Sequence, residues 1–359
     1  MDSNSYCETD VLVQNDIRIK SRIYSKAMLI LPISHKKYRK KIKRKLLFMD
    51  GVEDKLIMRD VSDILYKLSV IGAKVCISKD SLSVTILDFT RIFSICNDLH
   101  ELKIKLELIY LGSRYGFEVL QEGETPLTNR YILLGSAFVT LFNGIKFKYN
   151  SIDTYVITET FFLNSHSYFD YRDKIILDIG AAFGDTPLFY AYMGARKVIA
   201  VEPVNTSFLK ENLLLNPGLS QRIEVVKAAA GVSGYISLQK NSNNYFDGNA
   251  GSPGHSSTTV RVEGKTISDI IRYSGLTHVD ILKADCKGCE QFFTEDDFEL
   301  VLDGIEIECD FGYKSLLKFI NNQHFETEII HYDPADFRPF WMGGLIIAKR
   351  QRNHNLRDR

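Results

Sequence analysis

The chain has 359 residues, with 45 Lys and Arg against 45 Asp and Glu, and is 45% hydrophobic and 25% charged. These are the values of an ordinary globular protein, so they exclude a disordered, a collagen-like and a disulfide-scaffold chain, and the length favours two domains. The charge is uneven, because residues 1–150 hold 24 basic and 17 acidic residues while residues 151–359 hold 21 and 28. Zero net charge therefore does not exclude an anionic partner for the first half.

The sequence lacks the marks of a membrane or secreted protein. Its longest mostly apolar stretch, Tyr131 to Ile145, is interrupted by Ser136, Thr140 and Asn143 and is shorter than the ~18–20 residues of a membrane span. The polar first ten residues do not look like a signal peptide. Six cysteines in a chain of this length do not indicate a disulfide framework. We expect a reduced, cytoplasmic protein.

The first 125 residues predict a small accessory α+β domain. They contain a basic segment, residues 36–45, which holds eight Lys and Arg and no acidic residue. This segment is either a solvated helix face or a site for nucleic acid, anionic lipid or an acidic glycan. Apolar spacing then predicts a helix capped by Asp60, strands over 73–78 and 83–87, and a long helix over 88–111.

Residues 126–170 form a predicted hairpin and lead-in segment. Asn143-Gly144 favours the tight turn that joins two strands, here 137–142 and 145–149. From residue 171 to 350 the pattern alternates between strand and helix, which predicts an α/β domain with a doubly wound, mostly parallel sheet. The expected strands are 175–179, 198–201, 223–227, 280–284, 305–309, 327–332 and 345–348. The last two have no helix between them and predict an antiparallel edge, and residues 351–359 form a basic tail.

The most informative stretch runs from Lys174 to Pro187. A buried strand ends at Asp178, a turn with Gly180 and Gly184 follows, and we expect a helix capped by Thr186. The next strand ends at Glu202, which is placed to accept hydrogen bonds from ribose hydroxyls. Two glycines spaced G-x-x-x-G lack the central glycine of a dinucleotide fingerprint, so S-adenosylmethionine (SAM) is the better-fitting cofactor.

The segment DIGAAFGDTPLFYAYMGARKVIAVEP resembles the first two motifs of class I SAM-dependent methyltransferases, specifically the FkbM family. Three further stretches resemble that family: residues 147–161, residues 223–231 and ILKADCKGCE at 281–290, which is similar to the signature LKxDxEGxE. The resemblance covers about residues 144–348. It implies a seven-stranded Rossmann-like methyltransferase sheet over 171–350 and SAM as the cofactor, and we predict no metal site.

The resemblance also implies roles for individual residues. Gly180, Ala182 and Gly184 would line the methionine half of SAM, and Asp178 would anchor this turn or the amino group. Glu202 would bind the ribose, Ala228 and Ala229 would border the adenine, and Asp285 would face the methyl group. Asp185 and Pro203 flank these positions and complete the predicted set.

Methyl transfer to an oxygen needs an aligned nucleophile and a group that takes its proton. The candidates for that catalytic group are Asp285 at the end of the fourth strand, Glu290 at the end of the signature stretch that follows it, and Glu308 at the end of the fifth strand. Lys287 replaces the middle Glu of the signature, which indicates a different acceptor, a weakened enzyme or a harmless change at a helix start. The Cys286 and Cys289 pair has no second pair for a zinc site, so we expect two buried thiols.

The resemblance implies O-methylation of a hydroxyl on a sugar, glycan or other small metabolite. Two alternatives stay open: an RNA methyltransferase that uses the basic segment, and a non-catalytic SAM-binding protein, as Lys287 suggests. Base N-methylation is disfavoured, because the N/D-P-P-Y/F motif of such enzymes is replaced by Asp285-Cys286-Lys287-Gly288.

Overall fold

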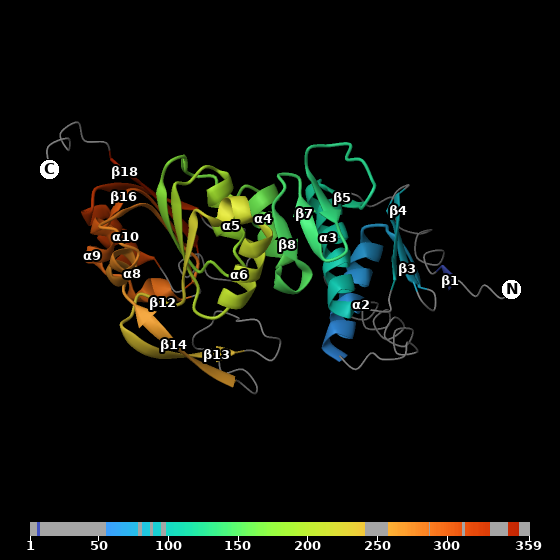
Figure 1. The fold of residues 1–359 in the computed structure, drawn as a ribbon, viewed down its shortest axis with the longest axis horizontal. Coiled ribbons are helices and arrows are strands. Elements are labelled where there is room, and N and C mark those ends of the chain that lie inside the picture. The colour runs from blue at the N-terminus through green and yellow to red at the C-terminus, as the bar shows by residue number, and fades with distance from the viewer. Residues whose placement is uncertain are drawn as a thin grey trace. The chain divides into compact units, whose positions relative to one another are not determined.

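The computed structural model of the protein describes residues 6–7, 55–77, 81–86, 89–94, 98–240, 258–286, 288–310, 313–330 and 344–351. The chain divides into two compact units, Met1–Gly144 and Ile145–Arg359, both drawn in Figure 1. The division falls between our expected boundaries at 125 and 170. The basic segment 36–45, Lys287 and the tail beyond residue 351 lie outside the described residues.

The first unit pairs two helices with small sheets. Helix α2 (Lys55–Val70) packs on α3 (Leu99–Tyr115), and their apolar faces bury Leu65, Leu68 and Leu106. One antiparallel sheet has the order β1-β2-β3-β4, and β5, β6 and β7 follow one another in a second sheet. The strand bounds are Tyr6–Cys7, Lys74–Ile77, Ser81–Ile86, Phe89–Ser94, Glu118–Gln121, Tyr131–Leu134 and Phe138–Leu141.

The predicted helix over 88–111 is wrong in its first part. Residues Phe89–Ser94 form strand β4, which pairs antiparallel with β3, and Ile92 in this strand is 63% exposed. The helix begins after Asp98, whose carboxylate accepts from the backbone N–H groups of His100 and Glu101. The apolar residues of β4 and of α3 together gave the spacing of a single helix, and the N-cap residue Asp98 marks where the helix actually begins. The predicted cap Asp60 is likewise wrong, since it lies inside α2.

The second unit is built on one seven-stranded sheet among its described residues, in the order β11-β10-β9-β15-β16-β18-β17. The first five strands run parallel, and β18 pairs antiparallel with both β16 and β17. This confirms the doubly wound, mostly parallel sheet with an antiparallel edge. The bounds in sheet order are Ile223–Val226, Lys197–Val201, Ile175–Ile179, Val279–Ala284, Val301–Cys309, Gly344–Arg350 and Phe325–Ile330.

Helices cover both faces of this sheet. On one face Leu177, Ile199 and Ile305 pack with residues of α8 (Ile267–Tyr273), α9 (Glu295–Glu299) and α10 (Lys314–Asn322). Side chains alternate along a strand, so Ile176 and Asp178 face the other side. There α5 (Asp185–Tyr192) contacts β9, β10 and β11, and α4 (Thr154–Phe162) packs on α5. Helices α6 (Thr206–Leu215) and α7 (Pro217–Ser220) complete this layer.

A second, smaller sheet has no counterpart in our predictions. It joins β12 (Ala229–Ala230) to β14 (Thr258–Lys265) and β13 (Gly234–Lys240). Strand β8 (Lys146–Lys148) and the short turn Tyr149–Ser151 open the unit, and the predicted turn at Asn143-Gly144 is present, with Gly144 at φ +84°. In the part of the chain that the structure describes, no helix has both the length and the apolarity to cross a membrane.

Candidate functional site

The turn after β9 is shaped by its glycines. Gly180 adopts φ +80°, and a Cβ there would lie 1.9 Å from the backbone oxygen of Asp285. Gly184 adopts φ +89° and is the N-cap of α5. The predicted cap at Thr186 is therefore wrong, and this residue lies in the first turn of the helix. Its hydroxyl instead donates to Asp178 Oδ2 over 2.6 Å, so it fastens the helix to the strand.

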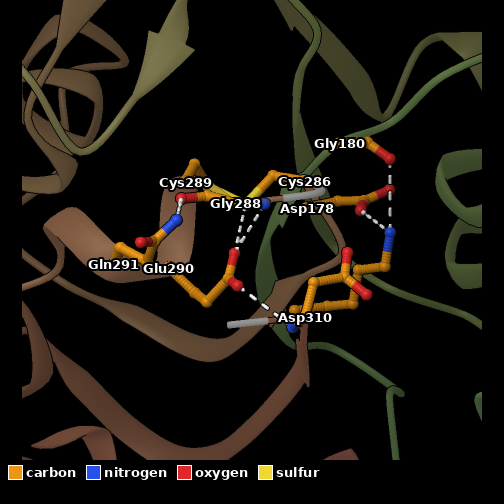
Figure 2. Close-up of a disulfide and its surroundings, with 9 residues drawn as sticks. Asp178, Gly180, Cys286, Gly288, Cys289, Glu290, Gln291 and Asp310 are labelled. Atoms are coloured by element: carbon orange, nitrogen blue, oxygen red, sulfur yellow. Dashed lines mark hydrogen bonds and ion pairs between the residues drawn. A yellow bond between two sulfur atoms is a disulfide. The ribbon is translucent and has the colours of Figure 1, made fainter. Parts of the chain in front are cut away.

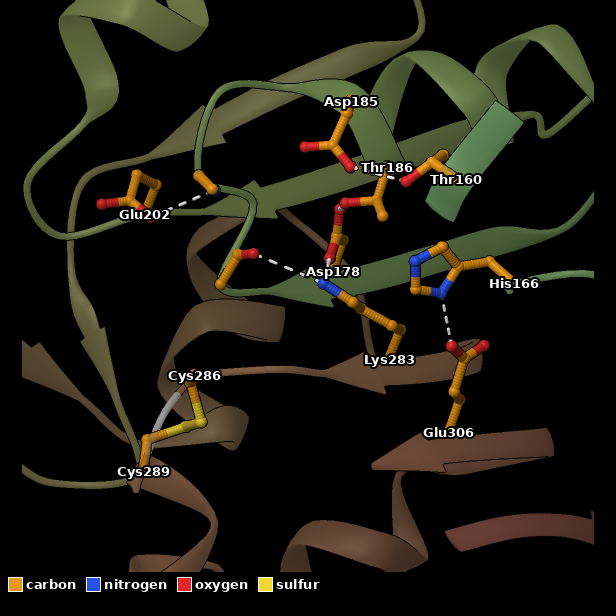
Figure 3. A network of polar contacts seen from close by, with 12 residues as sticks. Thr160, His166, Asp178, Asp185, Thr186, Glu202, Lys283, Cys286, Cys289 and Glu306 are labelled. Carbon is orange, nitrogen blue, oxygen red and sulfur yellow. Dashed lines mark hydrogen bonds and ion pairs between the residues drawn. A yellow bond between two sulfur atoms is a disulfide. The ribbon is translucent and has the colours of Figure 1, made fainter. Parts of the chain in front are cut away.

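A row of buried charges crosses the sheet beneath this turn. In the strand register Asp178 of β9 lies beside Lys283 of β15, and Lys283 lies beside Glu306 of β16. The three side chains are 0%, 3% and 2% exposed. Lys283 Nζ lies 3.0 Å from Asp178 Oδ1 and donates to the Gly180 carbonyl over 3.3 Å. The ammonium group therefore connects the end of β9 to the turn that follows it (Figure 3).

The covering layer adds partners to this row. His166, from the loop after α4, forms a 2.5 Å pair with Glu306, and Thr160 of α4 donates to Asp185 Oδ2 over 2.9 Å. Both carboxylates are buried and the imidazole is half-buried, and Figure 3 shows how these side chains lie around Lys283 and Asp178. The lead-in segment is thus joined to the sheet by one polar contact and to α5 by another. Asp185 belongs to this buried network and is only 2% exposed.

Burial and pairing shift the pKa values of this network. Burial opposes the charge of Lys283, but the nearby Asp178 and Asp285 outweigh it and raise the pKa of the ammonium. Burial likewise opposes protonation of His166, and its bond to Glu306 raises the pKa above 6.5. For Asp185 burial dominates and raises the pKa to about 6. The interior thus favours positive charge on Lys283 and His166.

Sequence reasoning missed Lys283, Glu306, His166 and Thr160. A signal was present for the first two, because each is a charged residue with an apolar residue on either side of it in a central strand. A buried charge costs several kcal/mol unless it is paired, so such a residue indicates a partner nearby. For His166 and Thr160 the sequence carries no comparable signal.

Glu202 follows strand β10, where we predicted it, and is 6% exposed. Its Oε2 accepts from the Ala182 N–H over 3.1 Å, and its Oε1 accepts from the N–H groups of Val204 and Asn205, each over 2.8 Å. The carboxylate thereby links the glycine turn to the loop after β10. A carboxylate has about four acceptor positions, and three are taken by these bonds. Pro203 follows directly and is half-buried.

The predicted adenine border lies at the end of β11. Ala228 is fully buried and belongs to the core under α8, while Ala229 begins the short strand β12. Since β10 and β11 are neighbours, their carboxyl ends lie at the same sheet edge as the glycine turn. The structure thus brings Gly180, Glu202 and Ala229 to one edge.

The three catalytic candidates differ in their surroundings. Asp285 follows β15, is half-buried, and its N–H donates to the Ile179 carbonyl over 3.0 Å. Glu308 lies near the end of the adjacent β16 and is half-buried. Glu290 is 1% exposed, and its carboxylate accepts from the N–H groups of Gly288 and Asp310. Burial raises the pKa of Glu290. Its two hydrogen bonds connect the loop after β15 to the loop after β16.

The expectation of two free thiols after β15 is wrong, because Cys286 and Cys289 are joined in a disulfide. Residues three apart can form a disulfide where a turn brings their Cα atoms to about 5–6 Å, and here they are 5.5 Å apart. Among the described residues, no three His, Cys, Asp or Glu side chains gather to hold a metal ion.

Comparison with known proteins identifies the domain. Residues 178–294 match the family profile described as the methyltransferase FkbM domain. Protein arginine N-methyltransferase 1 of Caenorhabditis elegans is 28% identical over 79 residues, which are 22% of this chain and 22% of that protein. The chain thus matches less than a quarter of that relative's length.

Similar solved structures are methyltransferases of low sequence identity. Fibrillarin from Aeropyrum pernix, solved with natively bound SAM, is 14% identical with a TM-score of 0.34 and covers 75% of this chain and 94% of its own. Precorrin-6y C5,15-methyltransferase from Geobacter metallireducens is 12% identical with a TM-score of 0.31 and covers 55% and 89%. Residues 178–294, less than half of the chain, therefore form a methyltransferase FkbM domain.

Proposed function

We propose that SAM binds at the carboxyl edge of β9 and β10, between the glycine turn and Glu202. The observation that carries this proposal is the 3.1 Å bond from the Ala182 N–H to Glu202. It fixes the carboxylate against the turn and leaves about one acceptor position for a ribose hydroxyl. Gly180 and Gly184 both adopt a positive φ, which gives the turn between β9 and α5 its shape beside this carboxylate.

When bound, SAM supplies an electrophilic methyl group on its sulfonium sulfur. The chain's own task is to align an acceptor oxygen and take its proton. We assign the proton-accepting role to Asp285, which is half-buried and follows the central strand β15. Glu308, next to it on β16, is the second candidate. Glu290 is fully enclosed and holds two backbone N–H groups, which favours a supporting role.

The acceptor we propose is a hydroxyl group on a sugar, glycan or small metabolite. The support is the FkbM match together with the missing N/D-P-P-Y/F motif after β15. We further propose a cytoplasmic location. An RNA acceptor remains the second candidate, because residues 36–45 form a run of positive charge suited to a phosphate backbone.

A transfer assay tests the acceptor class. Purified full-length protein is incubated with methyl-labelled SAM and with three fractions of the host extract: small metabolites and glycans, total RNA, and protein. We expect label in the first fraction, in a base-stable ether, since methyl ethers resist alkali whereas methyl esters do not. Label released by ribonuclease would support the RNA candidate, and no transfer despite SAM binding would favour a non-catalytic protein.

A further inference from the structure

The disulfide Cys286–Cys289 closes a four-residue ring between the end of β15 and the short helix Cys289–Phe292 (Figure 2). We propose that this ring is a reversible thiol–disulfide site whose oxidised form holds the SAM site together, so that reduction weakens SAM binding. The inference rests on the SAM site proposed above. It adds a redox-modification site that methyl transfer itself does not require.

At its first residue, Cys286, the ring lies next to the glycine turn after β9. A Cβ on Gly180 would lie 1.9 Å from the Asp285 oxygen and 3.3 Å from Cys286 Cα, so the two backbones are in close contact. The Asp285 N–H also donates to Ile179, the last residue of β9. Any movement of the backbone at Cys286 therefore acts directly on Gly180. It also moves Asp285, the residue we place beside the reacting groups.

The far end of the ring touches two other loops. A Cβ on Gly231, just after β12, would lie 3.1 Å from the Cys289 oxygen. Inside the ring, the Gly288 N–H donates to Glu290 Oε2 over 2.8 Å, and Glu290 Oε1 accepts from Asp310, just after β16, over 3.1 Å. The ring is thus in contact with the loops after β9, β12 and β16. The conformation of the ring therefore affects the glycine turn of the proposed SAM site and these two neighbouring loops.

A local cross-link of this kind restricts the conformations of the turn. Gly288 has φ +121°, so the glycine inside the ring gives little conformational restraint of its own when the sulfurs separate. Both cysteines are half-buried at the edge of the core, so the disulfide is not fully enclosed by the protein. In a reducing compartment, disulfides are mostly transient, catalytic or redox-sensing. A reversible site fits the cytoplasmic location that we propose.

The ring is reduced and oxidised by thiol–disulfide exchange. A dithiol reductant attacks one sulfur as its thiolate, and a second attack by the same reductant releases the other. The S–S bond breaks, Cys286 and Cys289 each gain one electron and one proton, and the reductant leaves as its own disulfide. An oxidised dithiol or oxidised glutathione reverses the reaction with the opposite balance.

The test measures SAM affinity by calorimetry on the full chain, after oxidation with oxidised glutathione and after reduction with a dithiol. Peptide mass after alkylation reports the state of the 286–289 pair without reference to SAM. We expect the oxidised form to bind at least about fivefold more tightly, the lower end of typical coupling between sites. By linkage, SAM should then make the disulfide harder to reduce, by about 30 mV for each tenfold difference in affinity.

Two variants separate this site from the other cysteines. The double variant Cys286→Ser, Cys289→Ser should bind SAM like the reduced protein and ignore the reductant. Cys309→Ala removes the free buried thiol of the described part and should keep the full response. Equal affinity in both redox states, a pair that never oxidises, or a serine variant that still responds would overturn the inference. Failure of every form to bind SAM would overturn the proposed SAM site and this inference with it, whereas the mass readout would still show whether the pair oxidises.

Discussion

Two neighbouring tyrosines of the second unit have buried hydroxyl groups that differ in their hydrogen bonding. Tyr171 and Tyr190 lie 4.8 Å apart by ring centroids, and both are nearly or fully buried. The Tyr171 hydroxyl donates to the His166 carbonyl, whereas the Tyr190 hydroxyl has no hydrogen-bond partner among the described residues. A buried polar group without a partner costs about 1–3 kcal/mol, and a made hydrogen bond contributes about 1 kcal/mol.

We therefore expect opposite effects from the same substitution. Tyr190→Phe should leave the free energy of unfolding unchanged or raise it, while Tyr171→Phe should lower it by about 1 kcal/mol. Urea unfolding of the full chain, followed by circular dichroism, measures both. A loss of more than about 1 kcal/mol in Tyr190→Phe would show that its hydroxyl is bonded after all.

The raised pKa of Asp185 makes the free energy of unfolding depend on pH. Burial raises its pKa to about 6 from the ordinary value of 3.8. The folded protein therefore holds this proton more tightly than the unfolded chain, so the contribution is present at low pH and is lost as the pH rises through 6. Relative to Asp185→Asn, the wild type should lose about 2 kcal/mol of unfolding free energy between pH 4 and pH 7.

Urea unfolding of both proteins at several pH values checks this expectation. The comparison keeps Lys283 and His166 in both chains, so their own titration largely cancels. A wild-type-minus-variant difference that stays constant across this pH range would contradict the raised pKa.

At the scale of elements, the cap decides where α3 begins. Asp98 accepts from the N–H groups of His100 and Glu101, the first donors of the helix. Asp98→Ala should cost about 1 kcal/mol, because these donors lose their acceptor, whereas Asp98→Asn should cost little, since Asn caps nearly as well. Urea unfolding measures both variants. Equal losses in the two would indicate that charge, not capping, is what Asp98 contributes.

The elements that the sequence predicted best are those with a local signature. Four of the five parallel strands of the second unit are followed directly by a glycine or an acidic residue, as Ile175–Ile179 is by Gly180, whereas Lys227 follows β11. The helix over 88–111 failed because its apolar spacing matched a helix by coincidence, and only Asp98 marked the true start. The small sheet β12-β14-β13 pairs strands across residues 241–257, a separation that local patterns do not carry.

The same distinction applies to the candidate site. Gly180 and Glu202 could be named because motif spacing is local, and the structure places both at one sheet edge. The buried row could not, because His166 meets Glu306 across 140 residues and Lys283 meets Gly180 across 103. Burial of a charge and the identity of its partner are properties of the folded sheet.

At the scale of the whole molecule, the charge asymmetry has a partial explanation. The second unit carries the FkbM domain, and several of its acidic residues belong to the sheet or its carboxyl edge: Asp178, Glu202, Asp285, Glu306 and Glu308. The excess of positive charge lies in the first half, where residues 36–45 lie outside the described part of the chain. The proposed cofactor thus concerns the second unit, whereas the candidate anionic partner concerns the first half of the chain.

The central claim is that SAM binds against the glycine turn after β9. A matched pair of glycine variants offers a direct test, because Gly180 abuts the Asp285 backbone at positive φ while a Cβ on Gly218 would meet no atom within 4 Å. The measurement is calorimetric titration of SAM into the oxidised full chain, into Gly180→Ala and into Gly218→Ala. The account predicts one SAM per chain for wild type and Gly218→Ala, and no measurable binding for Gly180→Ala. Absence of binding to wild type, or equal affinity in Gly180→Ala, would contradict it.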